Sequence, residues 1–128
     1  METIGTIAVI SREEGSGTRN VFAQLLGFSD GENASQSDRT RNDAVILDNT
    51  EKVLEKIAED DSAIGYVSAG SVSDNSEIKT LKVNGYDVTG DREKYPLSRI
   101  FYVAYQGTLS DVERDFLTFV KSAGQERK

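Results

Sequence analysis

Apolar residues fall into short runs separated by polar and glycine-bearing segments, which is typical of alternating strands and helices. The run from Ile4 to Ser11 is rich in β-branched residues and predicts a buried strand. A polar turn follows, and then helically spaced apolar residues predict a helix over residues 17–26, with Gly27 as its stop. Strand, glycine-containing turn and helix form the first unit of an α/β layer.

The middle of the chain is predicted to hold a long loop, a helix and a second strand. Residues 29–43 are polar and predict a surface loop. Asp48 and Glu51 have the spacing of a capping box, which predicts that Asp48 caps the next helix. The run from Ala63 to Val67 predicts a short strand.

Further elements are predicted in the last third of the chain. Residues 78–88 suggest two strands around a turn at Asn84-Gly85, a strong hairpin signal. A third clear strand is expected from Ile100 to Tyr105, and a second capping box over residues 110–113 opens a final helix. The residues expected in the core are Phe22, Leu25, Val53, Leu54, Ile57, Ile64, Val67, Phe101, Val103, Phe116 and Val120.

Length and composition place these elements in one globular domain. The chain has 128 residues, of which 37% are hydrophobic and 29% charged. A chain of this size buries enough surface for an independent core. It contains no repeats, low-complexity tracts or interior linkers. The predicted architecture is a single α/β domain over residues 1–128, with a mixed central sheet flanked by helices.

Charge and residue types exclude several functions. A net charge of -7 disfavours nucleic acid and anionic membranes, because both attract basic surfaces. The absence of cysteine and histidine removes thiol nucleophiles, the usual general base and the commonest zinc ligands. No cofactor, metal site or enzymatic activity is therefore predicted. The first ten residues have no basic segment typical of a signal peptide, and no stretch is long enough to span a bilayer.

The turn at Ser16-Gly17-Thr18 is the candidate for chemistry, because it lies where a strand passes into a helix. The first N–H groups of a helix have no partner within the helix, and the helix dipole places partial positive charge there. Glycine lets a ligand approach the backbone, and the two hydroxyls add donors. Arg12 is near enough in sequence to offer a bidentate fork to a tetrahedral oxyanion.

Two familiar glycine motifs do not fit this turn. A P-loop requires lysine after its last glycine, whereas Thr18 follows Gly17 here. The dinucleotide fingerprint requires a third glycine where this chain has Asn20. A structural interpretation also stays open, in which Ser16 is only a helix cap and Arg12 pairs with Glu13 or Glu14.

Several motifs, in order along the chain, resemble the phosphate-binding proteins that serve phosphate ABC importers. The first runs from Ile10 to Arg19 and precedes a helix containing Phe22. The others are residues 49–54, 63–68, 95–99 and 115–117, with Gly124-Gln125 near the end. The resemblance covers nearly the whole chain except the polar loop.

The resemblance implies a type II periplasmic-binding-protein-like fold with two lobes that close on the ligand. It assigns phosphate contacts to Arg12, Ser16, Gly17 and Thr18. The chain opens at the strand before the turn, so it is identified as the second lobe alone. The expected partners are inorganic phosphate, the missing first lobe and an ABC permease, in an extracytoplasmic setting.

In the family, the other lobe supplies an aspartate that accepts a proton from the ligand. Asp38, Asp43 and Asp48 are candidates for that role here only by their proximity to the loop. Arg19 is expected on the outer side of the helix start, away from the ligand.

Three functional hypotheses remain. The first is a phosphate-binding lobe that is not an enzyme. The second is an enzyme acting on a phosphorylated substrate, for which no suitable carboxylate or Ser/Lys spacing is present. The third is a stand-alone interaction or anion-sensing domain without a transport role, in which the turn survives as a helix cap.

Overall fold

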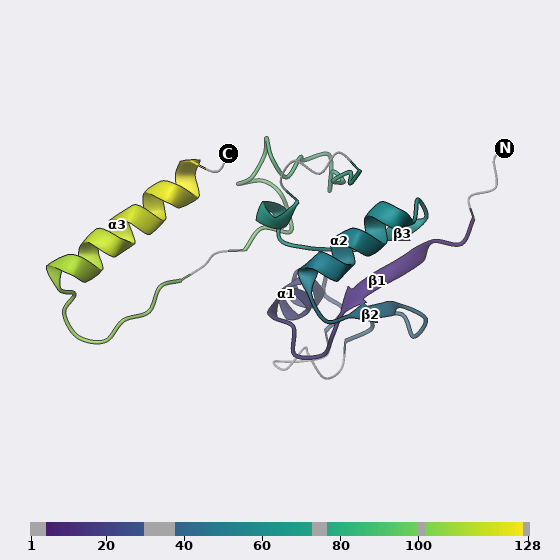
Figure 1. Cartoon of the computed structure of the whole chain (residues 1–128), viewed down its shortest axis with the longest axis horizontal. Helices are drawn as coiled ribbons and strands as arrows, with labels where there is room; N and C mark the ends of the chain where they lie inside the picture. The colour runs from purple at the N-terminus through teal and green to yellow at the C-terminus, as the bar shows by residue number, and fades with distance from the viewer. Residues whose placement is uncertain (1–4, 30–37, 73–76, 100–101, 127–128) are drawn as a thin grey trace. The chain divides into compact units, whose positions relative to one another are not determined.

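The computed structural model describes residues 5–29, 38–72, 77–99 and 102–126. The chain divides into two compact units, Met1–Ser98 and Arg99–Lys128 (Figure 1). The prediction of a single domain over residues 1–128 stays a prediction.

A three-stranded sheet forms the centre of the N-terminal unit, with strand order β2-β1-β3. The strands are β1 (Ala8–Arg12), β2 (Val45–Leu47) and β3 (Ala63–Ile64). Both neighbours run parallel to β1, with Ile10 opposite Val45 and Val9 opposite Ile64. The predicted α/β class is confirmed. The expected mixture of strand directions is wrong for the described residues, because their sheet is parallel.

Helix α1 (Gly17–Leu25) begins and ends where local signals predict. The side chain of Ser16 caps it by accepting a hydrogen bond from the Arg19 N–H at 3.3 Å. Gly27 adopts a φ of 70°, and its N–H donates to the Gln24 carbonyl at 3.1 Å. The Phe28 N–H donates to the Ala23 carbonyl at 3.0 Å, which completes a Schellman motif. Gly27 is therefore confirmed as the stop.

Helix α2 (Thr50–Glu59) begins one residue later than the capping-box spacing predicts. Asn49, in extended backbone conformation, is the N-cap and accepts from the Lys52 N–H at 2.9 Å. Asp48 instead pairs with the ammonium of Lys52 at 2.6 Å on the surface. The prediction of Asp48 as the cap is wrong because only one of these two adjacent residues caps the helix, and the side-chain oxygen of Asn49 accepts the bond from the Lys52 N–H.

The core lies where α1 and α2 pack against β1. Its fully buried apolar side chains among the described residues are Ile10, Ala23 and Val53. Gly65 comes close to this core, since a Cβ there would lie 3.0 Å from Ile57 Cδ1. That approach leaves no room for a side chain without movement of the isoleucine.

The expected core is only partly realised in the N-terminal unit. Val53 is fully buried, and four expected members are half-buried: Phe22, Leu54, Ile57 and Val67. Leu25 and Ile64 are 42% exposed, so their assignment to the core is wrong. Leu25 ends α1, and Ile64 lies on a two-residue strand at the edge of the sheet, so both have fewer neighbours than a central position.

Beyond β3, described residues form one 3-10 turn, η1 (Ala69–Ser71), and a tight reversal at Asn84-Gly85. Val83 and Tyr86 exchange both backbone hydrogen bonds at 3.0 Å, with φ of 52° at Asn84 and 83° at Gly85. The predicted turn is confirmed. Its flanking strands are not, because pairing stops at this single bridge.

The C-terminal unit contains helix α3 (Asp111–Glu126). Its predicted capping box is confirmed: the Ser110 N–H donates to Glu113 Oε2 at 2.6 Å, and the Glu113 N–H donates to Ser110 Oγ at 3.3 Å. Ile100 and Phe101 lie outside the described residues. Residues 102–105 form no strand, contrary to expectation.

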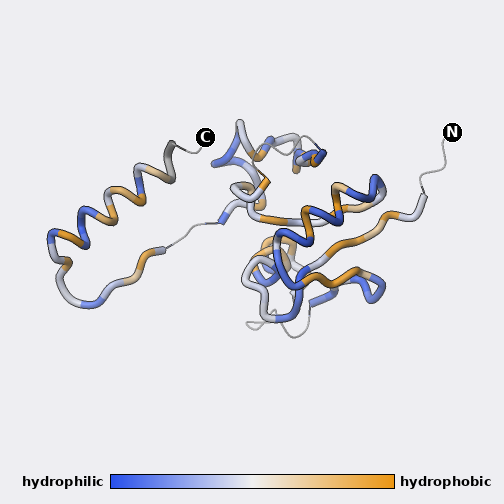
Figure 2. Tube along the Cα trace, viewed as in Figure 1, coloured by the Kyte–Doolittle hydropathy of each residue, from blue (hydrophilic) through white to orange (hydrophobic). Residues whose placement is uncertain are grey.

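Apolar side chains of the C-terminal unit are exposed rather than buried. Val103 is 60%, Phe116 64% and Val120 40% exposed, which contradicts their predicted core positions. Figure 2 shows apolar and polar residues alternating along α3. The helical spacing correctly indicates an amphipathic helix, but the unit by itself is too small to provide a second layer. No helix in the described parts of the chain is long and apolar enough to cross a membrane.

Candidate functional site

The Ser16-Gly17-Thr18 turn lies at the carboxyl end of β1, the central strand, and at the amino end of α1. The Ser16 N–H donates to the Glu13 carbonyl at 3.2 Å, which closes the turn. Gly15 has a φ of 87°, a conformation that favours glycine. The parallel sheet therefore carries a helix amino terminus at its carboxyl edge, where ligands of open α/β sheets commonly bind.

Two backbone donors of this turn have no hydrogen-bond partner within the described residues: the N–H groups of Gly17 and Thr18. A Cβ built on Gly17 would meet no atom within 4 Å, so the space around it is open. Ser16 is 5% exposed, and its oxygen already accepts the capping bond from Arg19. The structure thus brings Ser16, Gly17 and Thr18 together as predicted and leaves two N–H groups for an acceptor.

The guanidinium of Arg12 is engaged by neighbouring side chains. Nε donates to Glu13 Oε2 at 2.8 Å, Nη2 to Glu13 Oε1 at 3.0 Å, and Nη1 to Thr50 Oγ1 at 3.3 Å. The Glu13 carboxylate raises the pKa of Arg12, and the guanidinium lowers the pKa of Glu13. Glu13 therefore occupies the bidentate edge that an oxyanion would use, as in the structural interpretation of this segment.

Tyr66 connects the end of β1 to α1. Its hydroxyl lies 2.8 Å from Ser11 Oγ and accepts from the Arg12 N–H at 3.3 Å. Its ring stacks on Phe22, with centroids 4.0 Å apart and planes at 13°. The sequence predicts only that Tyr66 belongs to a strand, and this prediction is wrong because β3 ends at Ile64. The contacts of Tyr66 were not predicted.

Arg19 and Asp38 form an ion pair beside the turn. Arg19 Nε donates to Asp38 Oδ2 at 2.7 Å and Nη2 to Oδ1 at 2.9 Å, while Nη1 donates to the Arg12 carbonyl at 2.8 Å. The Arg19 side chain is 11% exposed and the Asp38 side chain 0%. The expectation that Arg19 lies on the outer side of the helix start is wrong, because Asp38 draws it inward.

The candidate proton-accepting aspartates all have cationic partners. Arg19 holds the pKa of Asp38 far below its ordinary value, with a further hydrogen bond from the Thr40 N–H at 3.0 Å. Asp43 accepts from Arg41 Nε at 2.9 Å, and Asp48 pairs with Lys52; both aspartates are exposed. Their suggested role toward a ligand stays a prediction.

Asn20 presents a buried oxygen, Oδ1, for which the described residues provide no hydrogen-bond partner. It lies in the first turns of α1, and its N–H donates to the Ser16 carbonyl at 3.0 Å. The sequence singled out this position only because it lacks the third glycine of a dinucleotide fingerprint.

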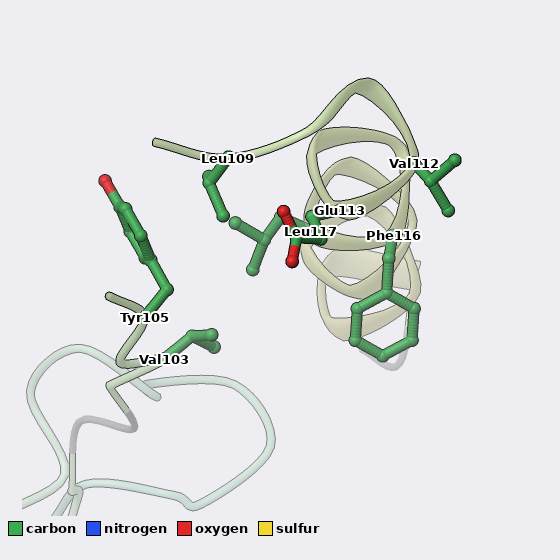
Figure 3. A pocket seen from close by; sticks show the side chains of 7 residues that line it. All are labelled: Val103, Tyr105, Leu109, Val112, Glu113, Phe116 and Leu117. Atoms are coloured by element: carbon green, nitrogen blue, oxygen red, sulfur yellow. The ribbon is translucent and has the colours of Figure 1, made fainter. Parts of the chain in front are cut away.

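A separate apolar hollow lies within the C-terminal unit. Figure 3 shows Leu109 and Leu117 pointing into a space whose other side is formed by Val103 and Tyr105. None of the predicted phosphate-binding residues lines it. The described residues also hold no cluster of three acidic side chains that could bind a metal ion. The turn at the start of α1 is therefore the candidate site.

A parallel sheet with a helix amino terminus at the carboxyl edge of its central strand places the described N-terminal unit in the α/β class. The family model of the PBP superfamily domain matches residues 4–123, so this chain belongs to that family.

Curated relatives extend the comparison. The chain is 38% identical over 121 residues to "Phosphate-binding protein PstS 2" of Streptococcus pneumoniae serotype 4, covering 92% of this chain and 41% of that protein. It is 38% identical over 123 residues to the protein of the same name from Streptococcus agalactiae, with the same coverage. The chain therefore spans less than half the length of these relatives.

Solved structures agree with the fold. A phosphate-binding protein of a phosphate ABC transporter from Streptococcus pneumoniae superposes with a TM-score of 0.74 at 38% identity, covering 91% of this chain and 46% of that one. An ABC-type phosphate transport receptor from Vibrio cholerae gives a TM-score of 0.65 at 23% identity, covering 95% and 49%, and supports the fold alone.

Proposed function

We propose that this chain is the phosphate-recognising part of a solute-binding protein of a phosphate ABC transport system. In this proposal the N–H groups of Gly17 and Thr18 bind the oxyanion, assisted by the hydroxyls of Ser16 and Thr18 and by Arg12. The observation that carries it is the pair of N–H groups at the start of α1, those of Gly17 and Thr18, for which the described part of the chain provides no partner. The relatives named as phosphate-binding proteins support phosphate as the anion.

The electrostatics of the turn favour an anion despite the net charge of -7. Aligned N–H groups and the dipole of α1 act within a few ångströms, whereas the negative charge of the whole chain is spread and screened. The contribution of an exposed helix terminus is roughly 0.3–1 kcal/mol, and hydrogen bonds to charged groups add about 1.5–3 kcal/mol each.

The turn offers donors to one face of the anion and leaves the other face in water, so much of this gain is offset by desolvation. A net gain of about 4 kcal/mol corresponds to a dissociation constant on the order of 1 mM. We expect millimolar or weaker phosphate binding by this chain alone, with sulfate bound about as well.

The remaining half of the cleft comes from a first lobe outside this chain, in keeping with the 41% coverage of the relatives. The complete protein then delivers phosphate to an ABC permease in an extracytoplasmic setting. No catalytic step is part of this role, so the protein is a binding component and not an enzyme.

The proposal is tested by adding inorganic phosphate to the ¹⁵N-labelled chain and following each backbone amide by NMR. We expect saturable shifts confined to the turn, largest at Gly17 and Thr18. Chloride at equal ionic strength is the control for general salt effects, and sulfate tests selectivity. Micromolar binding with strong preference for phosphate over sulfate would show that the chain builds a complete site, contrary to the half-site proposed here.

The alternative is a stand-alone interaction or anion-sensing domain. It is favoured by the bidentate contact of Glu13 with Arg12, because this contact uses the arginine internally. An absence of phosphate-induced shifts at Gly17 and Thr18 would support the interaction domain. Shifts together with failure to associate with any first lobe would support the sensor.

A further inference from the structure

We propose that Arg19 and Asp38 are a positioning pair that fixes the geometry of the oxyanion turn without touching the ligand. The inference rests on the proposed function for its ligand. Its structural content, the control of the Gly17 and Thr18 amides by a buried ion pair, is independent of what binds there.

Three hydrogen bonds of Arg19 define the arrangement. Two parallel bonds of 2.7 and 2.9 Å join its guanidinium to Asp38, and a third of 2.8 Å joins it to the carbonyl of Arg12. The same residue donates its backbone N–H to Ser16 Oγ. Arg19 therefore holds both ends of the turn: the last residue of β1 through a carbonyl and the first turn of α1 through its own backbone.

Asp38 fixes the direction of the guanidinium. Both of its oxygens are occupied by Arg19, and Oδ1 also accepts from the Thr40 N–H at 3.0 Å. Since a planar guanidinium held by a bidentate carboxylate has one orientation, the third donor is aimed at the Arg12 carbonyl. By orienting Arg19, Asp38 thus fixes the distance between the end of β1 and the start of α1.

The burial of Asp38 distinguishes this ion pair from the one that Arg12 forms with Glu13. The Asp38 side chain is 0% and the Arg19 side chain 11% exposed, and their charges cancel locally. The bidentate edges of Arg12 and Arg19 both face a carboxylate. The side chain of Glu13 is 36% exposed and has room to give way to an anion, whereas that of Asp38 is 0% exposed. The pair affects binding through the backbone amides of Gly17 and Thr18, which lose their alignment if the ion pair between Arg19 and Asp38 is broken.

Single variants make the two roles distinguishable. If Arg19 positions the turn, Arg19→Gln and Asp38→Asn both weaken phosphate binding, by about tenfold for each amide that loses one hydrogen bond to the anion. If Arg19 binds the anion directly, Asp38→Asn releases its guanidinium and strengthens binding. The opposite sign for Asp38→Asn would overturn the proposal.

Removal of one member leaves a buried charge without its partner and reduces stability. The double variant Arg19→Met with Asp38→Leu removes both charges together, a change that proteins often tolerate well. We expect this variant to fold, as judged by circular dichroism, and to bind phosphate more weakly than the unaltered chain. Equal affinity of the folded double variant would contradict a positioning role.

Arg41→Gln is the matched control, because Arg41 makes an exposed ion pair with Asp43 close by in sequence, with 52% and 64% of the side chains exposed. It removes the same charge as Arg19→Gln without affecting the turn. We expect its Gly17 and Thr18 resonances and its phosphate affinity to match those of the unaltered chain.

The phosphate-free spectra separate this inference from the proposed function. We expect the amide resonances of Gly17 and Thr18 to move in Arg19→Gln and in the double variant before any anion is added. If they move but phosphate causes no shift in the unaltered chain, the proposed function fails and the positioning role stands. If they do not move, the positioning role is refuted whether or not phosphate binds.

Discussion

Replacement of Glu13 by glutamine is expected to strengthen oxyanion binding, because Glu13 competes for Arg12. Two hydrogen bonds of 2.8 and 3.0 Å place its carboxylate on the bidentate edge of the guanidinium. The two side chains are 36% and 12% exposed, so water screens the pair only in part. An anion that reaches Arg12 must first displace this internal carboxylate.

The magnitude follows from the energy of such a pair. Partly exposed ion pairs contribute about 0.2–1 kcal/mol, and each 1.36 kcal/mol corresponds to a tenfold change in affinity. Release of Arg12 therefore strengthens phosphate binding by roughly 1.4- to 5-fold. Removal of a negative charge beside the bound anion acts in the same direction.

The assay is the phosphate titration of Glu13→Gln followed at the amides of Gly17 and Thr18, at pH 7 and fixed ionic strength. Glu14→Gln is the matched control, since this neighbouring side chain is exposed and no described contact joins it to Arg12. An equal gain in both variants would attribute the effect to net charge alone. Weaker binding in Glu13→Gln would show that Glu13 orients Arg12 for the ligand, and the competition argument would be wrong.

Three further outcomes are expected. Arg12→Ala lowers phosphate affinity about tenfold in calorimetry, because a charged donor is lost; unchanged affinity would remove Arg12 from the site. Ser16→Ala reduces the free energy of unfolding by about 1 kcal/mol in urea denaturation, since α1 loses its cap. Asp38→Asn destabilises the chain at neutral pH. Because the folded-state pKa of Asp38 is lowered, its contribution is complete above the ordinary value of 3.8 and is lost as the pH falls below it. Denaturation curves of the variant and the unaltered chain therefore converge in acid, and a constant difference would contradict this linkage.

Local signals allowed the boundaries of the candidate site to be predicted. Ser16 and Gly27 bound α1 through hydrogen bonds within four residues in sequence, so the pattern of residue types is sufficient. The position of Arg19 depends on Asp38, which lies 19 residues further along in a polar segment with no periodicity. No local rule indicates which aspartate an arginine will choose, and the buried pair was therefore missed.

The short strand β2 and the exposure of the apolar face of α3 could not be predicted from the sequence, for a different reason. The three residues of β2 are too few to show a period, although they complete one side of the sheet. The apolar spacing of α3 correctly predicted one apolar face, but Phe116 on that face stays 64% exposed. Periodicity indicates that a face is apolar and carries no information about which surface covers it.

The central strand of the sheet is also the first to be synthesised. β1 pairs Ile10 with Val45 and Val9 with Ile64, so both partners leave the ribosome long after it. Pairings between such distant residues close large loops and form slowly compared with helices. A nascent chain that ends before β3 leaves one edge of β1 without a parallel neighbour and exposed to association with other chains. The segment that carries Arg12 therefore acquires both of its strand neighbours only when synthesis has passed Ile64.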